Sequence, residues 1–143
     1  MDYLVLLETA NKVRELQYKM YKKISDETGM HYTSIEIVSF LYNNKTIQTT
    51  KEICSLLNLK PNLVSFHIDK LVKEEFIIRE PIDEYRRKIK LILTEKSVPI
   101  AEKCNSIRRK LFDKITSNCS KKEWDNFVSF MFKLMTNLKD TSL

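Results

Sequence analysis

The chain is poor in the residues that interrupt regular structure, since its 143 residues include one glycine and three prolines. These two residue types normally mark turns and loops, so their scarcity predicts long helices and few loops. Hydrophobic residues make up 43% of the chain, a share that supports a packed core and argues against wholesale disorder. The length predicts a single domain over residues 1–143, or one domain whose helical extensions need a partner for their burial.

Long apolar runs are also missing. No stretch reaches the roughly 18 consecutive apolar residues of a membrane-spanning helix, and the first residues lack the positive charge of a secretion signal. The cysteines, Cys54, Cys104 and Cys119, are odd in number and widely spaced, which fits reduced thiols. Cys54 and Cys104 lie on apolar stripes and are predicted to be core residues. We expect a soluble cytoplasmic protein without a membrane partner.

Motifs of catalysis and metal binding are missing as well. The chain has no glycine-rich phosphate loop, no nucleophile elbow, and no acid pair at helical spacing with a partner histidine. Its two histidines, His31 and His67, are far apart in sequence, and no Cys, His or carboxylate spacing around them is typical of a metal site. The sequence therefore predicts a protein that is not an enzyme and uses no cofactor or metal.

Helical periodicity is the most regular pattern that the chain does contain. Residues 3–27 carry apolar side chains at three- and four-residue steps, and Gly29 is placed to end that helix. Three hydroxyl residues are followed three positions later by a glutamate, which is the spacing of a capping box at a helix start. These pairs are Thr33 with Glu36, Thr49 with Glu52, and Ser120 with Glu123.

Residues 49–94 hold the most informative arrangement. Two short helices, 49–57 and 61–75, are joined by a tight connection at 58–60, and a hairpin follows with strands at 76–82 and 86–94. Two helices followed by a basic hairpin are the order of a winged helix-turn-helix, which places one helix in the DNA major groove and a charged ribbon beside it. The predicted fold is mainly α, of the α+β class, with this DNA-binding part at 33–96.

The second helix of the pair has two distinct sides at 100° per residue. Val64, Ile68 and Leu71 share the inward side, while the opposite side carries residue types that contact bases or phosphates. An outward Phe66 would meet a thymine methyl group, and the alternative is that Phe66 folds back under the hairpin as core. The predicted DNA-contacting residues of this region are Lys60, Pro61, Asn62, Ser65, Phe66, His67 and Lys70.

The hairpin adds a cluster of positive charge. The formal net charge is +6 and the isoelectric point is near 9.2, values that fit a polyanionic partner but also many solvated proteins. Arg86, Arg87 and Lys88 fall at the predicted hairpin tip, where they would reach phosphates or the minor groove. The alternative is an edge strand kept soluble by its charges.

The terminal helices carry more apolar surface than the central region can cover. A fifth helix is predicted after residue 97, capped by Thr94 or Ser97 with Pro99 in its first turn, and a sixth over 121–138. The economical solution is a homodimer in which the segments 1–28 and 97–143 of two chains interlock, and the alternative is packing within one chain.

The order of elements and several short runs resemble the MarR family of bacterial transcription regulators. The matching runs are Thr33–Val38, Lys51–Leu57, Val64–Ser65, Lys70–Ile77, Asp83–Lys88 and Leu93–Lys96. The resemblance implies a homodimer, a pseudo-palindromic operator in double-stranded DNA, and repression that is usually relieved by a small-molecule effector or by oxidation. The lysine-rich, glycine-poor texture is also similar to the single-domain SarA-like branch.

The chain departs from the family pattern at several positions. Phe66 stands where the family commonly has an arginine, Ser97 replaces a glycine, and Glu75 or Phe76 replaces the glycine before the hairpin. The resemblance implies an effector crevice, for which the candidate wall residues, or alternatively core residues, are Tyr18, Tyr21, Tyr32 and Phe40.

The sequence predicts a sequence-specific DNA-binding repressor. The alternative is a winged-helix module that binds another protein, as an anti-repressor or polymerase accessory, with its basic hairpin merely solvated.

Overall fold

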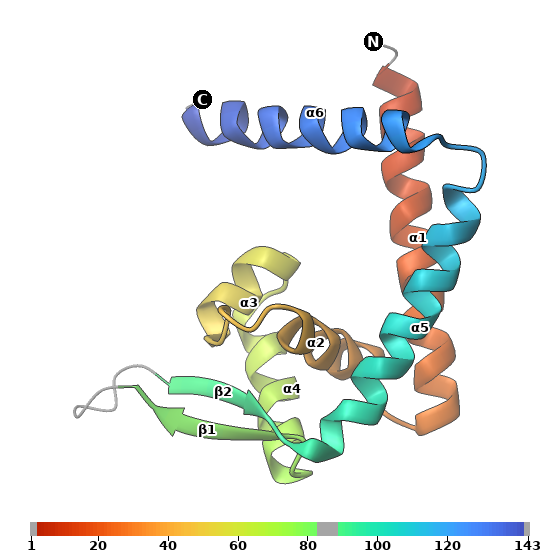
Figure 1. Cartoon of the computed structure of the whole chain (residues 1–143). Coiled ribbons are helices and arrows are strands. Elements are labelled where there is room, and N and C mark those ends of the chain that lie inside the picture. The colour runs from red at the N-terminus through yellow and green to blue at the C-terminus, as the bar shows by residue number, and fades with distance from the viewer. Residues whose placement is uncertain (1–2, 83–88, 142–143) are drawn as a thin grey trace. The chain divides into compact units, whose positions relative to one another are not determined.

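The structure is a computed structural model that describes residues 3–82 and 89–141, and it confirms a mainly helical chain with a small antiparallel sheet (Figure 1). The chain forms two compact units, and the boundary between them lies between residues 108 and 109. The helix α5 (Val98–Ile115) begins in the first unit and ends in the second, which also contains α6 (Lys121–Asp140). The other elements of the first unit are α1 (Tyr3–Thr28), α2 (Tyr32–Asn43), α3 (Thr50–Leu57), α4 (Pro61–Lys73), β1 (Ile77–Pro81), β2 (Ile89–Leu93) and the short 3-10 helix η1 (Glu95–Ser97).

The core of the first unit is built around α2, which lies between α1 and α4 (Figure 1). Ile35, Ile37 and Val38 of α2 are completely removed from solvent. They pack with buried side chains of the neighbouring helices and of the sheet, which include Ile24, Ile53, Val64, Ile68, Leu71, Ile77 and Leu91. A helix that is apolar on several sides is a buried helix, and the position of α2 therefore fixes where α1 and α4 can lie.

The connection from α1 to α2 contains one confirmed prediction and one wrong one. Gly29 has a φ of +72° and donates its N–H to the Ser25 carbonyl at 2.9 Å, so it ends α1 as predicted. The capping box predicted at Thr33 and Glu36 is wrong, because α2 begins one residue earlier and Thr33 is already inside it. His31 caps α2 instead, with its Nδ1 accepting the Thr33 N–H at 3.2 Å.

The other two predicted capping boxes are confirmed. The Thr49 hydroxyl accepts the Glu52 N–H at 3.3 Å, and the Glu52 carboxylate accepts the Thr49 N–H at 2.9 Å. Ser120 and Glu123 make the same pair of bonds at 3.3 and 2.8 Å. Hydrogen bonds from the Thr49 side chain and then from backbone N–H groups hold the pKa of Glu52 below its ordinary value.

The end of α4 explains the missing glycine before the hairpin. The Glu75 N–H bonds the Val72 carbonyl at 3.0 Å and the Phe76 N–H bonds the Leu71 carbonyl at 2.8 Å, which together form a Schellman motif. The motif requires a left-handed residue, and Glu75 takes that conformation with a φ of +63°. The predicted helix 61–75 therefore ends at Lys73, two residues early.

The hairpin has a short and fully paired ladder. β1 and β2 are antiparallel, from the pair Ile77–Leu93 to the pair Pro81–Ile89. Leu91 is buried and its N–H bonds the Gln48 carbonyl at 2.8 Å, which attaches the hairpin to the segment before α3. Both described strands are shorter than predicted, and Arg86, Arg87 and Lys88 lie outside the described residues.

The start of α5 also differs from the prediction. The Ser97 hydroxyl donates to the Phe76 carbonyl at 2.5 Å, and Thr94 makes no side-chain cap bond, so neither residue caps α5 through its side chain. Pro99 is the second residue of α5, within the first turn as predicted. None of the helices in 3–82 and 89–141 is long and apolar enough to cross a membrane.

Two neighbouring glutamates provide a test of the α4 terminus. Replacing Glu75 by glycine should raise the free energy of unfolding by about 0.5–1 kcal/mol, because a left-handed conformation strains residues with a Cβ atom but not glycine. Urea denaturation at a fixed protein concentration measures the change.

The matched control is Glu74→Gly, at a position whose φ of −87° suits any residue. This change should lower the free energy of unfolding by a similar amount, since glycine there only adds freedom to the unfolded chain. If both variants change the free energy of unfolding in the same direction, the left-handed conformation assigned to Glu75 is wrong.

Candidate nucleic-acid interface

The turn between α3 and α4 sets the direction of the second helix. Asn58 ends α3 in the left-handed conformation with a φ of +51°, and the Leu59 N–H bonds the Cys54 carbonyl at 3.1 Å. Lys60 is the N-cap of α4 in an extended conformation, and Pro61 occupies the first helical position, where its missing N–H is not needed. The chain therefore turns sharply within three residues, as the sequence predicts.

The two sides of α4 are those predicted from its periodicity. Val64, Ile68 and Leu71 are completely buried and hold the helix in the core. Five of the predicted contact residues are exposed on or before the first two turns: Lys60, Pro61, Asn62, Ser65 and Phe66. Because the buried face fixes the orientation of α4, these exposed residues form one continuous outward face.

Phe66 is an exposed aromatic residue on this face, with 63% of its surface accessible. The alternative in which it folds back under the hairpin is therefore wrong. Its ring meets the buried His67 ring edge-on, at 5.2 Å between centroids. That contact orients Phe66 outward, where an apolar ring can meet a thymine methyl group.

His67 does not belong to the outward face, and its predicted role in contacting DNA is wrong. The side chain is 3% exposed, its Nδ1 lies 2.9 Å from the Ser34 hydroxyl of α2, and its ring stacks on that of His31 at 4.6 Å. Burial first, and then the nearby His31 and Lys70, lower the pKa of His67 below its ordinary value. His67 therefore connects α4 to α2 as an uncharged ring.

The far end of α4 carries ion pairs that the sequence did not reveal. Lys70 is half-buried with its Nζ 4.0 Å from the Glu74 carboxylate, while Arg79 of β1 donates to the Asp69 carboxylate at 2.5 Å. The second pair joins the hairpin to α4. The outward Asp69 on an otherwise basic helix face was the one available signal, but only the fold identifies its partner.

The N-cap residue of α4, Lys60, makes no side-chain cap hydrogen bond. A helix N-terminus carries partial positive charge and attracts anions such as phosphate. Here the first turn also carries Lys60 and the exposed amide of Asn62, whose Oδ1 accepts the Leu63 N–H at 3.0 Å. Charge, helix dipole and hydrogen-bonding groups thus combine at one end of the outward face.

Residues 3–82 and 89–141 contain no cluster of three or more His, Cys, Asp or Glu side chains that could hold a metal ion. Cys104 is buried and burial raises the pKa of its thiol, whereas Cys54 is half-buried and Cys119 is exposed. Burial confirms Cys104 as the core residue that the sequence predicts.

Comparisons with known proteins agree with this geometry. A model of the MarR family matches residues 30–89, which run from the residue after Gly29 to the first residue of β2. The matched residues, 30–89, resemble the winged helix of the MarR family. The MarR family consists of transcription regulators, and the resemblance seen in the sequence is thereby confirmed.

Solved structures of MarR-family regulators share the fold over nearly the whole chain. A DNA complex of MepR from Staphylococcus aureus is 19% identical, with a TM-score of 0.70 over 95% of this chain and 96% of that one. A MarR protein from Peptoclostridium difficile is 16% identical, with a TM-score of 0.75 over 98% and 90%. MarR from Oenococcus oeni is 18% identical, with a TM-score of 0.67 over 98% and 100%. No curated protein matches the chain.

The assignment of inward and outward faces of this MarR-family helix can be tested through stability. Phe66→Ala should change the free energy of unfolding by no more than about 0.5 kcal/mol, because the side chain is largely exposed. The matched change Ile68→Ala, two residues away, should cost about 2–5 kcal/mol, since it empties a fully buried site. Urea denaturation of both variants measures these changes. A large loss of unfolding free energy in Phe66→Ala would mean that its ring lies in the core.

Proposed function

We propose that the chain is a sequence-specific DNA-binding repressor that acts as a homodimer on a pseudo-palindromic operator. The observation that carries the proposal is the outward face of α4, where Lys60, Asn62, Ser65 and Phe66 are exposed at an N-terminus without a side-chain cap. These are residue types that contact phosphates, base edges and thymine methyl groups. The DNA complex among the structural relatives supports the same role.

The hairpin supplies the second part of the proposed interface. Its ladder is fixed to α4 by the Arg79–Asp69 ion pair and to the segment before α3 by the bond from Leu91 to Gln48. The residues that follow Ile82 include Arg86, Arg87 and Lys88. We propose that these three cations bind phosphates or the minor groove beside the helix.

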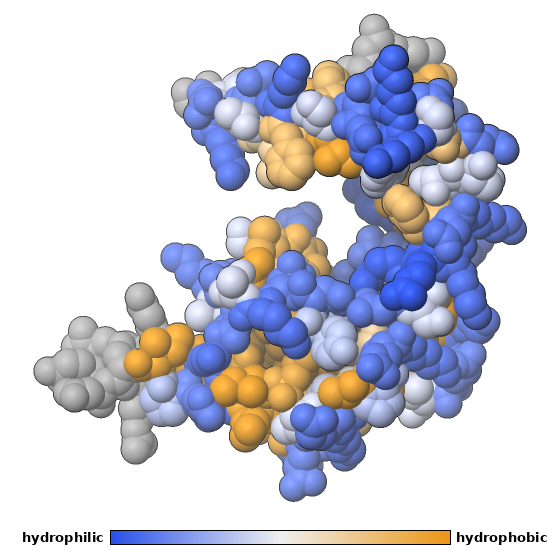
Figure 2. All heavy atoms as spheres, in the orientation of Figure 1, coloured by the Kyte–Doolittle hydropathy of each residue, from blue (hydrophilic) through white to orange (hydrophobic). Residues whose placement is uncertain are grey.

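The homodimer is supported by apolar surface on the terminal helices. In α6 none of the described residues is buried, although the helix carries Trp124, Phe127, Met131 and Met135. On the face shown in Figure 2, apolar residues gather along one side of α6, next to hydrophilic residues. An apolar helix face of this size is characteristic of a surface that a partner covers.

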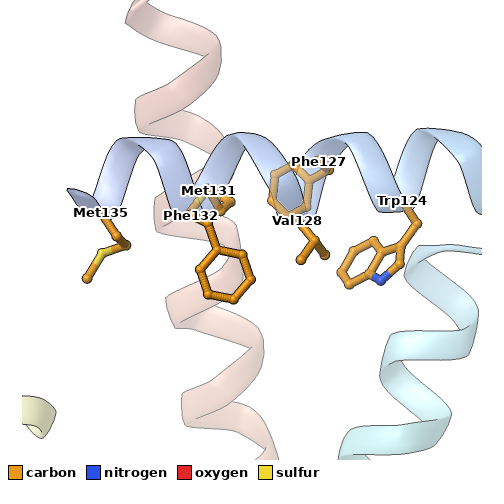
Figure 3. A pocket seen from close by; sticks show the side chains of 6 residues that line it. All are labelled: Trp124, Phe127, Val128, Met131, Phe132 and Met135. Atoms are coloured by element: carbon orange, nitrogen blue, oxygen red, sulfur yellow. The ribbon is translucent and has the colours of Figure 1, made fainter. Parts of the chain in front are cut away.

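The same face of α6 forms a shallow hollow of about 260 Å³. Figure 3 shows Trp124, Val128, Phe132 and Met135 projecting from one side of the helix, with Phe127 and Met131 beside them. α1 adds exposed apolar residues at its N-terminal end, including Tyr3, Val5 and Leu6. We propose that 1–28 and 97–143 of two chains interlock through these faces.

A small-molecule effector is part of the proposal by family likeness alone. Of the four aromatic candidates for a crevice wall, Tyr21 is buried in the core, and Tyr32 and Phe40 pack against the core. Tyr18 is 49% exposed. Tyr18 is therefore the one of the four that best fits a wall open to an effector.

DNA titration can test whether α4 contacts bases while the hairpin contacts phosphates. Asn62→Ala should cost about 1–3 kcal/mol on a duplex selected from a random pool by the wild-type protein, and little on a scrambled duplex. Arg86→Ala and Arg87→Ala should instead weaken binding to both duplexes and lower the salt slope by about 1 for each lost phosphate contact. Affinities are measured at several salt concentrations.

Two outcomes of this titration would contradict the proposal. Failure of the wild-type protein to enrich any sequence would favour the alternative of a winged-helix module that binds another protein. Unchanged affinities in both arginine variants would make the hairpin a solvated ribbon.

The proposed homodimer interface is tested by charge placed on either side of α6. Met131→Glu should convert the dimer to a monomer at micromolar concentration, because a carboxylate cannot be buried in an apolar interface without a partner. The matched control Ser129→Glu adds the same charge on the opposite side of the helix and should leave the dimer intact. Sedimentation equilibrium gives the masses, and a wild-type mass of one chain would exclude the homodimer.

A further inference from the structure

A continuous series of ring contacts connects α1 with the outward face of α4. Tyr18 of α1 meets Tyr32 edge-on at 5.5 Å between centroids, and Tyr32 stacks on His31 at 4.5 Å. His31 stacks on His67 at 4.6 Å with 29° between the ring planes, and His67 meets the exposed Phe66 edge-on at 5.2 Å. The two histidines lie at the centre of this series, so their charge state affects the contacts on both sides.

Each imidazole is held by a hydrogen bond at its Nδ1 atom. The Nδ1 of His31 accepts the Thr33 N–H at 3.2 Å, which caps α2. Only a ring with a lone pair on Nδ1 can accept this bond, so the cap on α2 fixes the position of the His31 ring. The Nδ1 of His67 lies 2.9 Å from the Ser34 hydroxyl, and Ser34 is itself buried.

The surroundings of His67 oppose a positive charge. The groups that act on it are the stacked His31 from the segment before α2, and Lys70 from its own helix, with Tyr32 and Tyr18 behind His31. Burial, and then the neighbouring His31 and Lys70, lower the pKa of His67, and no carboxylate of the described residues contributes to that shift. Two charged imidazoles stacked at this distance would repel each other.

We infer that the stacked pair His31–His67 makes the seating of α4, meaning its packing on α2 with the outward face exposed, depend on protons, so that DNA binding weakens when His67 becomes charged. The inference rests on the proposed DNA-binding function. His31 and His67 act as positioning residues, because they reach the outward face through Phe66 and through the packing of α4 on α2. A charged His67 separates from His31, and α4 then loses one of the contacts that orient its exposed side.

The direction of the pH dependence follows from the lowered pKa of His67. The ordinary value is 6.5, so above pH 6.5 the ring is neutral whether α4 is seated or released, and the seated state keeps its full stability. As the pH falls from 6.5 toward the lower value of the folded protein, the released state takes up the proton first and seating is lost. A histidine cation that merely bound phosphate would strengthen DNA binding in acid, which is the opposite sign.

The protein alone allows a direct measurement, because His31 and His67 are its only histidines. Their C2 protons, followed by NMR between pH 8 and pH 5, report the two titrations separately, with assignment by substitution. We expect the His67 midpoint to lie below 6.5 and to rise in His31→Asn. Asparagine keeps an oxygen that can cap α2 but removes the stacked, titrating ring. A midpoint at 6.5 in the wild type, or one unmoved by His31→Asn, would overturn the inference.

The consequence for DNA is measured on a duplex selected by the wild-type protein from a random pool at pH 8. At constant ionic strength, the wild type should bind this duplex at least about threefold more weakly at pH 5.5 than at pH 8. The variants His67→Gln and His31→Asn should lose most of that response. The control Tyr42→Phe changes a tyrosine of α2 that is not part of the ring series, and should respond as the wild type does.

The outcomes separate the two proposals. If no duplex is enriched at pH 8, the DNA-binding function itself fails. If a duplex is enriched but is bound equally or more tightly at pH 5.5, only the proton dependence fails. If His67→Gln does not fold, His31→Asn and the wild-type titration still decide between these results.

Discussion

The buried hydroxyl groups of α2 need hydrogen-bond partners, and the partners that they find determine how the first unit is assembled. Ser34 is 1% exposed and Ser39 is completely buried. Ser34 pairs with His67 on α4, while Ser39 accepts a hydrogen bond from Arg108 on α5 at 2.8 Å. A buried hydroxyl without a partner costs about 1–3 kcal/mol, so these bonds select one arrangement among the many that apolar packing alone would tolerate.

The histidine pair carries the polar part of the contact between α2 and α4. Apolar burial of Val64, Ile68 and Leu71 is non-directional and supplies most of the energy of that contact. The bond to Ser34 and the stack on His31 supply direction, because both depend on how the two rings are oriented. The contact between α2 and α4 can therefore take its stability from apolar side chains and its proposed pH dependence from the histidines.

Local patterns predicted the elements of this fold well, because they depend on residues close in sequence. The capping boxes at Thr49 and Ser120, the glycine end of α1 and the inward face of α4 are all of this kind. The error at the start of α2 is local, since His31 replaces Thr33 as the cap. The prediction that His67 contacts DNA depends on longer separations, because the pattern around it does not show that Ser34 and His31 lie against its ring.

Three further features also depend on contacts that the sequence pattern does not show. Ser97 bonds the Phe76 carbonyl, 21 residues away, instead of capping α5. Glu75 takes the left-handed position that a glycine would fill more easily, because the Schellman bonds and the Thr94 hydroxyl, which donates to the Glu75 carbonyl at 2.7 Å, hold it there. The outward position of Phe66 also needed the fold, since a single apolar residue on a polar face is compatible with either side.

The helix α5 joins these observations to the proposed dimer. Its first half is anchored against α2 by the buried Ala101 and Cys104 and by the bond from Arg108 to Ser39, and its second half belongs to the unit that contains α6. Since α2 bonds both α5 and α4, this one buried helix fixes the start of α5 and the position of α4 within the first unit.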